Sequence, residues 1–485
     1  MPDIRYVCLS DLHLGAESSV LSRLGEDGVD VRTAAPTLSG LVDCLGELIS
    51  RNEDQTTRPT LVLCGDILEL ALSIENVPAM VFERFVDLAF PDGGRLFDDT
   101  IYFVPGNHDH HLWEGSRERQ YADYILDPKE AGKDLKPPWH TTRMLALTDP
   151  DPIDTVFLNA VVRRNPDRAD MCVRAVYPNL AIPSADGRRW AVIHHGHFVE
   201  SLYRAMSVVR DLVFPGRTPP AQVWDWEAEN FAWIDFLWSA LGRSGEVGES
   251  LGVGYDSLKS AKAMNQLAAN LASGLAAKRR SPGPARWVEA RVLRLVLQSL
   301  VERVAAQERR DPTVALSPRA EKGLALYLEG PLRSQILGEA PDNCPPEEVT
   351  FVFGHTHKPF VTQRTPSGYG RRVDVYNTGG WVVDTPRPAP MQGAAAILLD
   401  EDLNAASLRL FNQSGDGRPT RAHVQHAGVS DNPFSARLAG MVDPDAQPWS
   451  GFSSTVAEAV NERRQRLCDS LSDLERPPAE KPAWT

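Results

Sequence analysis

The chain has 485 residues, of which 42% are hydrophobic, and its formal net charge is −14 at pH 7. This length and composition are typical of a globular protein with one large domain and insertions, or with two or three domains. The acidic charge argues against a surface built mainly to coat a nucleic-acid backbone. Because the sequence has no N-terminal targeting segment and no run of about 18 apolar residues, we expect a cytoplasmic protein without a transmembrane helix.

Short apolar runs recur along the chain, and each ends in a polar turn. The runs are IRYVCLS, TLVLC, TIYFVP, WAVI and TFVF, and the side chains that follow them include Asp11, Asp66, Asn107, His195 and His355. Continuous apolar runs are typical of buried strands, and reactive groups at strand ends are typical of an α/β fold. Helices are predicted at 35–52 and 77–90, and closing strands at 373–382, 394–400 and 405–411.

The six cysteines are scattered without a CxxC pair. Cys8 and Cys64 lie within predicted core strands. This pattern favours buried free thiols in a reducing compartment over disulfides or a thiolate zinc site.

Two short motifs have the spacing of metal ligands. Asp11 and His13 are two residues apart, as are His355 and His357. On an extended segment, such residues project from the same side and can contact one cation. Neutral imidazoles suit Mn, Fe, Zn or Ni better than Ca or Mg.

The turn after the second strand contains Asp66, which follows a glycine. Its carboxylate has two oxygens and could bridge two metals, although Asp is also a favoured N-cap of a helix. Glu69 is then either a group that supports a ligand or a solvated helix residue.

The turn after the third strand, GNHDHH, is the richest in polar groups. Asn107 offers a neutral carbonyl oxygen as a ligand, and His108 could protonate a leaving group while Asp109 fixes its orientation. His110 and His111 have no assignable task, and we expect them to line the cleft or to face solvent.

Taken in order, these motifs resemble the calcineurin-like metallophosphoesterase family. They are DLH at 11–13, GDILE at 65–69, GNHD at 106–109, HG at 195–196 and GHTH at 354–357. The resemblance implies an α/β fold in which a β-sandwich of two mixed sheets is flanked by helices, with two divalent metal ions at the strand ends. It implies that Asp66 bridges the metals, that one is held by Asp11, His13 and His357, and that the other is held by Asn107, His195 and His355. His195 is preferred to His194 because the family ligand directly precedes a glycine.

The implied mechanism needs no nucleophile from the protein. Two cations lower the pKa of a bridging water, bind phosphate oxygens and neutralise charge during in-line attack. Mn is the expected metal, with Fe, Zn or Ni as alternatives. His108 would act as the acid for the departing alkoxide.

Residues 198–349 are too many for an ordinary loop, and we predict that they form a mainly helical cap that selects the substrate. Within them, the aromatic segment 224–242 either packs into the core of the cap or offers a face to an apolar ligand or a membrane. The wide apolar stripe at 286–307 indicates burial, oligomerisation or lipid contact. Basic residues between 278 and 310 form a solvated face or attract phosphate or anionic lipid.

The predicted order of domains is the first part of the core at 1–197, the cap at 198–349, the second part of the core at 350–411 and a polar C-terminal extension with one helix at 412–485. The predicted function is a dinuclear metal-dependent phosphoesterase that acts on a phosphorylated small molecule or a lipid-linked substrate.

Alternatives are a metal-dependent nuclease, a non-catalytic scaffold and a UDP-diacylglucosamine-type lipid pyrophosphatase. That last branch also has a helical insertion between the same motifs, but it has arginine and aspartate where this chain has His108 and His197.

Overall fold

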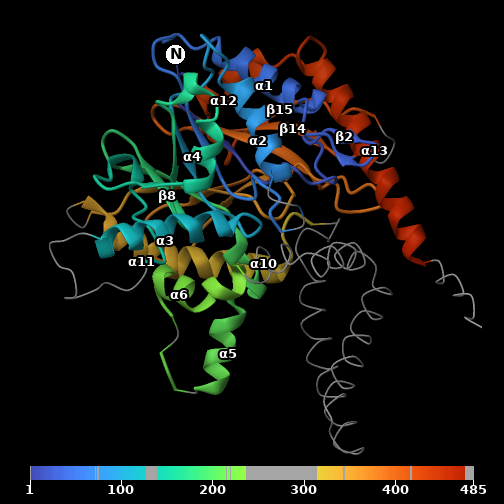
Figure 1. Cartoon of the computed structure of the whole chain (residues 1–485). Helices are drawn as coiled ribbons and strands as arrows, with labels where there is room; N and C mark the ends of the chain where they lie inside the picture. The colour runs from blue at the N-terminus through green and yellow to red at the C-terminus, as the bar shows by residue number, and fades with distance from the viewer. Residues whose placement is uncertain are drawn as a thin grey trace, which may run out of the picture.

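The computed structural model describes residues 2–71, 73, 76–126, 139–214, 216–218, 220–235, 314–341, 344–414 and 418–475. Its centre is a pair of mixed β-sheets (Figure 1). The larger sheet comprises, in spatial order, β15 (His423–Gln425), β14 (Ala405–Asn412), β13 (Gly393–Leu399), β1 (Tyr6–Leu9), β4 (Thr60–Leu63), β5 (Thr100–Phe103), β7 (Cys172–Ala175) and β6 (Ile153–Asp154). The smaller comprises β11 (Phe360–Arg364), β12 (Val373–Asn377), β10 (Glu348–Phe353), β9 (Arg189–His194) and β8 (Asn179–Pro183).

The two sheets share an apolar core. Cys8, Val62 and Tyr102 from the larger sheet pack in one cluster with Ile193 and Val352 from the smaller. The period of two along a strand places alternate residues in this core and on the outer face of each sheet. This arrangement of two mixed sheets flanked by helices confirms the predicted fold.

Parallel pairing brings the ends of several strands to one edge of each sheet. Strands β1, β4, β5 and β7 run parallel to one another, and so do β9, β10 and β12. The turns after β1, β4, β5, β9 and β10 carry the motifs of the sequence. The pairing therefore gathers segments that are far apart in the chain.

Helices cover the outer face of the larger sheet. Their apolar sides form one cluster with the sheet, and they are α1 (Pro36–Ile49), α2 (Asn76–Ala89), α4 (Val156–Val162), α12 (Pro433–Met441) and α13 (Trp449–Glu475). The sequence predicts one helix after residue 412, whereas the structure has both α12 and α13 as well as strand β15. Phe434, Trp449 and Phe452 are buried in the cluster, so this polar, Pro- and Gly-rich segment is packed on the core by a few large apolar side chains.

The described part of the predicted cap is helical. It contains η3 (His197–Val199), η4 (Ser201–Arg204), α5 (Ala205–Val213), α6 (Val223–Ile234), α10 (Pro318–Tyr327), η7 (Leu328–Leu332) and α11 (Arg333–Glu339). Buried residues of this part, including Trp226 and Tyr327, pack on the outer face of the smaller sheet. Phe231 is also buried, as the core interpretation of the aromatic segment predicts, whereas Trp224 is 41% exposed. Phe236, Trp238, the apolar stripe at 286–307 and the basic residues at 278–310 lie outside the described residues.

The remaining elements complete the described part of the chain. They are the hairpin of β2 (Leu24–Gly25) and β3 (Gly28–Val29), helix α3 (His110–Leu126), and the single turns η1 (Ala146–Thr148) and η2 (Pro166–Arg168). Cys8, Cys44 and Cys64 are buried free thiols, as expected, while Cys344 is exposed. Across the ranges that the structure describes, no helix is both long and apolar enough to span a bilayer.

Candidate metal centre

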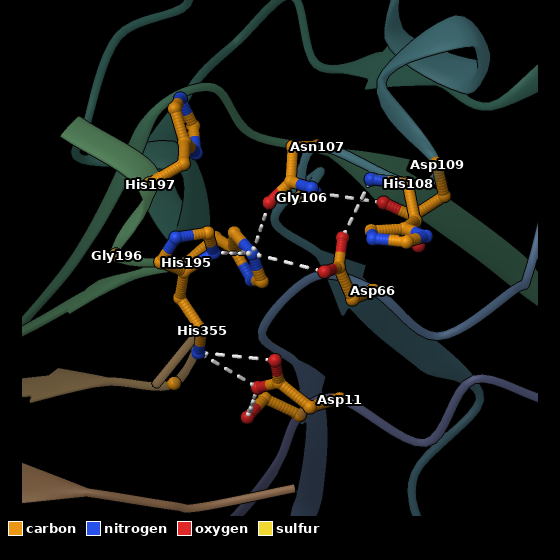
Figure 2. Close-up of polar contacts among 12 residues, drawn as sticks. Asp11, Asp66, Gly106, Asn107, His108, Asp109, His195, Gly196, His197 and His355 are labelled. Atoms are coloured by element: carbon orange, nitrogen blue, oxygen red, sulfur yellow. Dashed lines mark hydrogen bonds and ion pairs between the residues drawn. The ribbon is translucent and has the colours of Figure 1, made fainter. Parts of the chain in front are cut away.

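The predicted ligands meet in one buried cluster at the joined edges of the two sheets. Each is at most 2% exposed, and they are Asp11, His13, Asp66, Asn107, His195, His355 and His357. Figure 2 shows Asp11, Asp66, Asn107, His195 and His355 approaching one another from separate strand ends. The structure therefore brings together every residue that the sequence nominated as a ligand.

The backbone at these turns is unusual for residues with side chains. Six non-glycine residues of the described chain have positive φ, and five belong to the cluster: Asp11 (51°), His13 (44°), Asp66 (51°), His355 (68°) and His357 (56°). Such conformations are uncommon outside glycine and are held only where the surroundings require them. Their concentration here indicates that the turns are shaped to aim side chains at a common point.

Glycines make room for the carboxylates of the cluster. A Cβ on Gly106 would lie 2.2 Å from Oδ1 of Asp66, and a Cβ on Gly354 would lie 2.1 Å from Oδ2 of Asp11. Both separations are far below van der Waals contact. The glycines of GNHD and GHTH are therefore needed for close packing rather than for a turn conformation.

One half of the cluster surrounds Asp11. Nε2 of His357 lies 3.3 Å from Oδ1 of Asp11, and His13 belongs to the same group of potential ligand atoms. The backbone N–H of His355 donates to Asp11 at 3.0 Å. This group consists of the three residues expected to hold one metal.

The other half surrounds His195. Its Nε2 lies 3.1 Å from Oδ1 of Asn107, 3.2 Å from Nδ1 of His355 and 3.3 Å from Oδ2 of Asp66. The same Asp66 oxygen lies 3.8 Å from Nε2 of His13. Asp66 thus stands between the two halves, where a bridging carboxylate would have to be.

The outward nitrogen of each cluster histidine also has a neighbour. Nδ1 of His13 lies 2.9 Å from Glu69, Nδ1 of His195 lies 3.1 Å from the carbonyl oxygen of Cys64, Nε2 of His355 lies 3.5 Å from Glu200, and Nδ1 of His357 contacts Asp384. Metal-ligating histidines in proteins have such contacts, which fix the ring and its tautomer. Sequence reasoning missed Glu200 and Asp384, because neither stands in a motif and only the fold brings them to the rings.

His108 is oriented by a different carboxylate from the one predicted. Its Nδ1 lies 2.9 Å from Oε1 of Glu69, whose other oxygen contacts His13. Asp109 instead accepts backbone N–H groups of Gly106 and Ile67, each at 2.7 Å. Asp109 therefore links the turn after β5 to the turn after β4. Glu69 is buried rather than solvated, and it orients His108.

Comparison with known proteins is consistent with this geometry. Residues 4–229 match the model of the calcineurin-like phosphoesterase family. Residues 4–229 therefore form a domain of this family, and the chain carries that domain. It is accordingly a metal-dependent phosphoric ester hydrolase by class. A search of curated proteins finds no match to the chain.

The phosphoesterase cluster has strongly shifted acid–base equilibria. Burial alone would raise the pKa of Asp66, but His195 and His108 hold it well below its usual range. Burial alone would lower the pKa of His195, but Asp66 beside it raises that pKa to about 9. Burial and the charge of Asp66 raise the pKa of Asp109 to about 7. The attraction between the carboxylate of Asp66 and the imidazole of His195 thus opposes the effect of burial on the pKa of each group.

The donor set fits divalent metal ions. Nε2 of His13 and Oδ2 of Asp66 are buried, and neither has a hydrogen-bond partner among the described residues. Buried polar atoms without a partner are costly and call for an explanation. Imidazole nitrogens, carboxylates and an amide oxygen are ligands suited to Mn, Fe, Zn or Ni, so cations between these atoms would satisfy them.

The other histidines of the phosphoesterase motifs lie beside the cluster but face away from it. His197 projects away from Asp66 in Figure 2, and its Nε2 lies 3.1 Å from the hydroxyl of Tyr177. His194 accepts the N–H of Gly196 at 2.7 Å. His110 is fully buried against Glu227, at 3.1 Å, whereas His111 is partly exposed beside Glu114. The preference for His195 over its neighbours therefore agrees with the geometry.

Proposed function

We propose that the cluster binds two divalent cations, with Mn preferred, and hydrolyses a phosphate ester or a pyrophosphate bond. The proposal rests on one observation above all: a single oxygen of Asp66 lies 3.8 Å from His13 in one half of the cluster and 3.3 Å from His195 in the other. In this proposal Asp11, His13 and His357 would hold the first cation, Asn107, His195 and His355 would hold the second, and the carboxylate of Asp66 would be available to both.

The bound cations would supply positive charge to the phosphate oxygens and lower the pKa of the attacking water. The chain's own contribution is to keep that pair of sites rigid. The positive φ angles at the turns and the buried contacts of Glu69, Glu200 and Asp384 hold the imidazoles in place.

His108 acts as the proton donor to the leaving group. Glu69 contacts its Nδ1, which fixes the orientation of the ring and leaves Nε2 as the atom that can release a proton. The ring centroid of His108 lies 4.7 Å from that of His13, so the acid is next to the first cation site. This position is suitable for a group that protonates the oxygen of the leaving group.

The start of the cap reaches the cluster, which supports the proposal that the cap takes part in choosing the substrate. Glu200 lies 3.5 Å from His355, and the ring of Tyr203 lies 5.2 Å from the ring of the same histidine. A substrate seated on the cations would therefore meet residues of η4 and the turn before it.

The test is hydrolysis by protein that has been stripped of metal and refilled with Mn²⁺. p-Nitrophenyl phosphate and bis(p-nitrophenyl) phosphate are compared, and bound metal is measured on the same sample. We expect about two metal ions per chain and metal-dependent turnover of at least one ester. Binding of no metal would overturn the proposal and favour a non-catalytic role, and equal activity of stripped and refilled protein would overturn the metal mechanism.

A further inference from the structure

A pocket lies between the η3–η4 region and helix α10, next to the metal centre. It holds about 290 Å³ and is lined by Glu200 and Arg204 on one side and by Arg319 and Lys322 on the other. Glu200 connects the two sites, because it lines this pocket and its Oε1 lies 3.5 Å from Nε2 of His355. The pocket and the metal centre are therefore separated by a single side chain, that of Glu200.

The pocket has three cations, Arg204, Arg319 and Lys322, and one carboxylate, Glu200, which lies beside His355. Within the described ranges, no carboxylate forms an ion pair with Arg204, Arg319 or Lys322. Nearby arginines are paired: Arg210 with Glu229, and Arg364 with Glu321 at 2.7 Å. The chain as a whole has a net charge of −14, so three cations without ion-pair partners around one pocket differ from its general acidity.

Arg204 is the most constrained of the three cations. Its guanidinium lies over the ring of Trp226, with the central carbon 5.2 Å from the ring centroid. Its Nε is buried and has no hydrogen-bond partner among the described residues. A planar guanidinium held on an aromatic ring, with an N–H left over, is suited to binding an oxyanion.

Helix α10, which carries Arg319 and Lys322, is packed tightly against the core of the cap. A Cβ on Gly323 would lie 1.9 Å from the carbonyl oxygen of Val199, so helix α10 is pressed against η3. Ser317 caps the helix by accepting the N–H of Ala320 at 3.2 Å, and it also lines the pocket. The positive end of the helix dipole therefore adds to the charge of the side chains.

We propose that this pocket binds a second anionic group of the substrate. On this view the natural substrate carries a phosphate or carboxylate in addition to the phosphorus centre that is cleaved, and Arg204, Arg319 and Lys322 recognise it. The inference rests on the proposed function, because it takes the metal centre as the place of cleavage.

The experiment measures inhibition of p-nitrophenyl phosphate hydrolysis by Mn²⁺-loaded protein, with metal in excess over inhibitor. A series of α,ω-alkane bisphosphonates of increasing chain length is compared with alkylphosphonates of the same lengths. At the length that spans both sites, we expect the bisphosphonate to inhibit about tenfold more strongly, the gain typical of one charge-assisted contact. An ω-carboxyalkylphosphonate of that length shows whether carboxylate or phosphate is preferred.

The double variant Arg319→Glu/Lys322→Glu should remove the advantage of the bisphosphonate, so that both inhibitors act equally. Both residues are exposed, so folding should be unaffected. Arg58→Glu is the charge control, because Arg58 is exposed and precedes β4, at the opposite end of that strand from Asp66; it should keep the advantage.

The outcomes separate the two proposals. Hydrolysis by the wild type without any preference for a bisphosphonate would overturn this inference alone, as would a preference that survives in the double variant. Absence of hydrolysis of every ester would overturn the proposed function, and this inference with it.

Discussion

Two sets of histidines differ in the side chains that surround them. The first set comprises the proposed metal ligands His13, His195, His355 and His357, called the metal-facing histidines below, and each of them lies near a carboxylate. The ring-packed histidines are His110, His140, His194 and His197, whose rings lie beside aromatic side chains, and His110 among them also contacts Glu227. His194 is 4.6 Å from Tyr327 between ring centroids, and His197 is 4.4 Å from Phe198.

The contrast shows that neighbours, rather than burial, decide what a histidine can do. His194 and His195 are consecutive and both fully buried. Burial and the adjacent imidazoles lower the pKa of His194 well below its usual value, whereas Asp66 raises that of His195 against the effect of burial. Because successive side chains leave a strand on opposite sides, one residue enters the apolar layer under α10 and the other reaches the carboxylates.

The largest expected effect comes from removing the carboxylate shared by the metal-facing set. Asp66→Ala should abolish metal binding and lower turnover by at least roughly 1000-fold, because both cation sites lose a ligand. Metal content and p-nitrophenyl ester hydrolysis measure this directly. Asp400→Ala is the control: Asp400 is also fully buried, but it accepts hydrogen bonds from Asn404 and Asp402 in a turn away from the cluster. An active Asp66→Ala protein would refute the assignment of the site.

The next effect separates proton donation from metal binding. His108→Ala should retain both metal ions but lose roughly 100-fold or more in turnover, the usual contribution of a general acid. The loss should grow as the leaving group becomes more basic, so a series of substituted phenyl phosphates gives a steeper dependence on leaving-group pKa in the variant. An unchanged slope would show that His108 does not protonate the leaving group.

Two buried glutamates sharpen the comparison further. Glu69 contacts His13 and His108, whereas Glu227 contacts His110 and Tyr177. Glu69→Gln should weaken metal binding or activity by about 10- to 100-fold, as loss of a carboxylate behind a ligating histidine does. Glu227→Gln should leave the metal content unchanged. Equal metal loss in both variants would mean that the two sets of histidines are not functionally distinct.

The sequence predicted which residues gather at the candidate metal centre, but not the side chains that support them. A pair such as Asp11 and His13 can be recognised from its spacing in the sequence. The apolar runs before each motif predicted the strands that bring the motifs together. Glu200 and Asp384 have no such local record, because their roles arise only when β9, β10 and the segment after β12 meet. The orienting role given to Asp109 failed for the same reason, since Glu69 reaches His108 from another strand end.

The C-terminal segment shows the same limit in the fold. Its apolar residues are sparse, so their spacing predicted one helix where the structure has two. Phe434 and Trp449 become informative only when the outer face of the larger sheet is present to receive them. Local patterns thus predicted secondary structure and ligand motifs formed by neighbouring residues. They did not predict contacts between residues that are far apart in the sequence.

The smallest expected effect is a pH dependence of stability in the ring-packed set. His140 lies beside Trp224 and Phe231, and burial together with the charge of Arg117 lowers its pKa from 6.5 to about 4. Between these pH values the unfolded chain binds a proton that the folded chain does not, so stability is full above pH 6.5 and falls as the pH approaches 4. His140→Phe should therefore lessen the loss of thermal stability on acidification, as a difference from the wild type in melting scans across this pH range.

The exposed His423 provides the control for that effect. His423→Phe should leave the acid-dependent loss as large as in the wild type, because His423 is exposed and does not belong to the ring-packed set. Should His140→Phe and the wild type lose stability in parallel, an aromatic environment would not be what keeps this histidine neutral. The ring-packed histidines would then share only their packing against aromatic rings. Shifts of histidine pKa caused by neighbouring groups would distinguish only the metal-facing histidines.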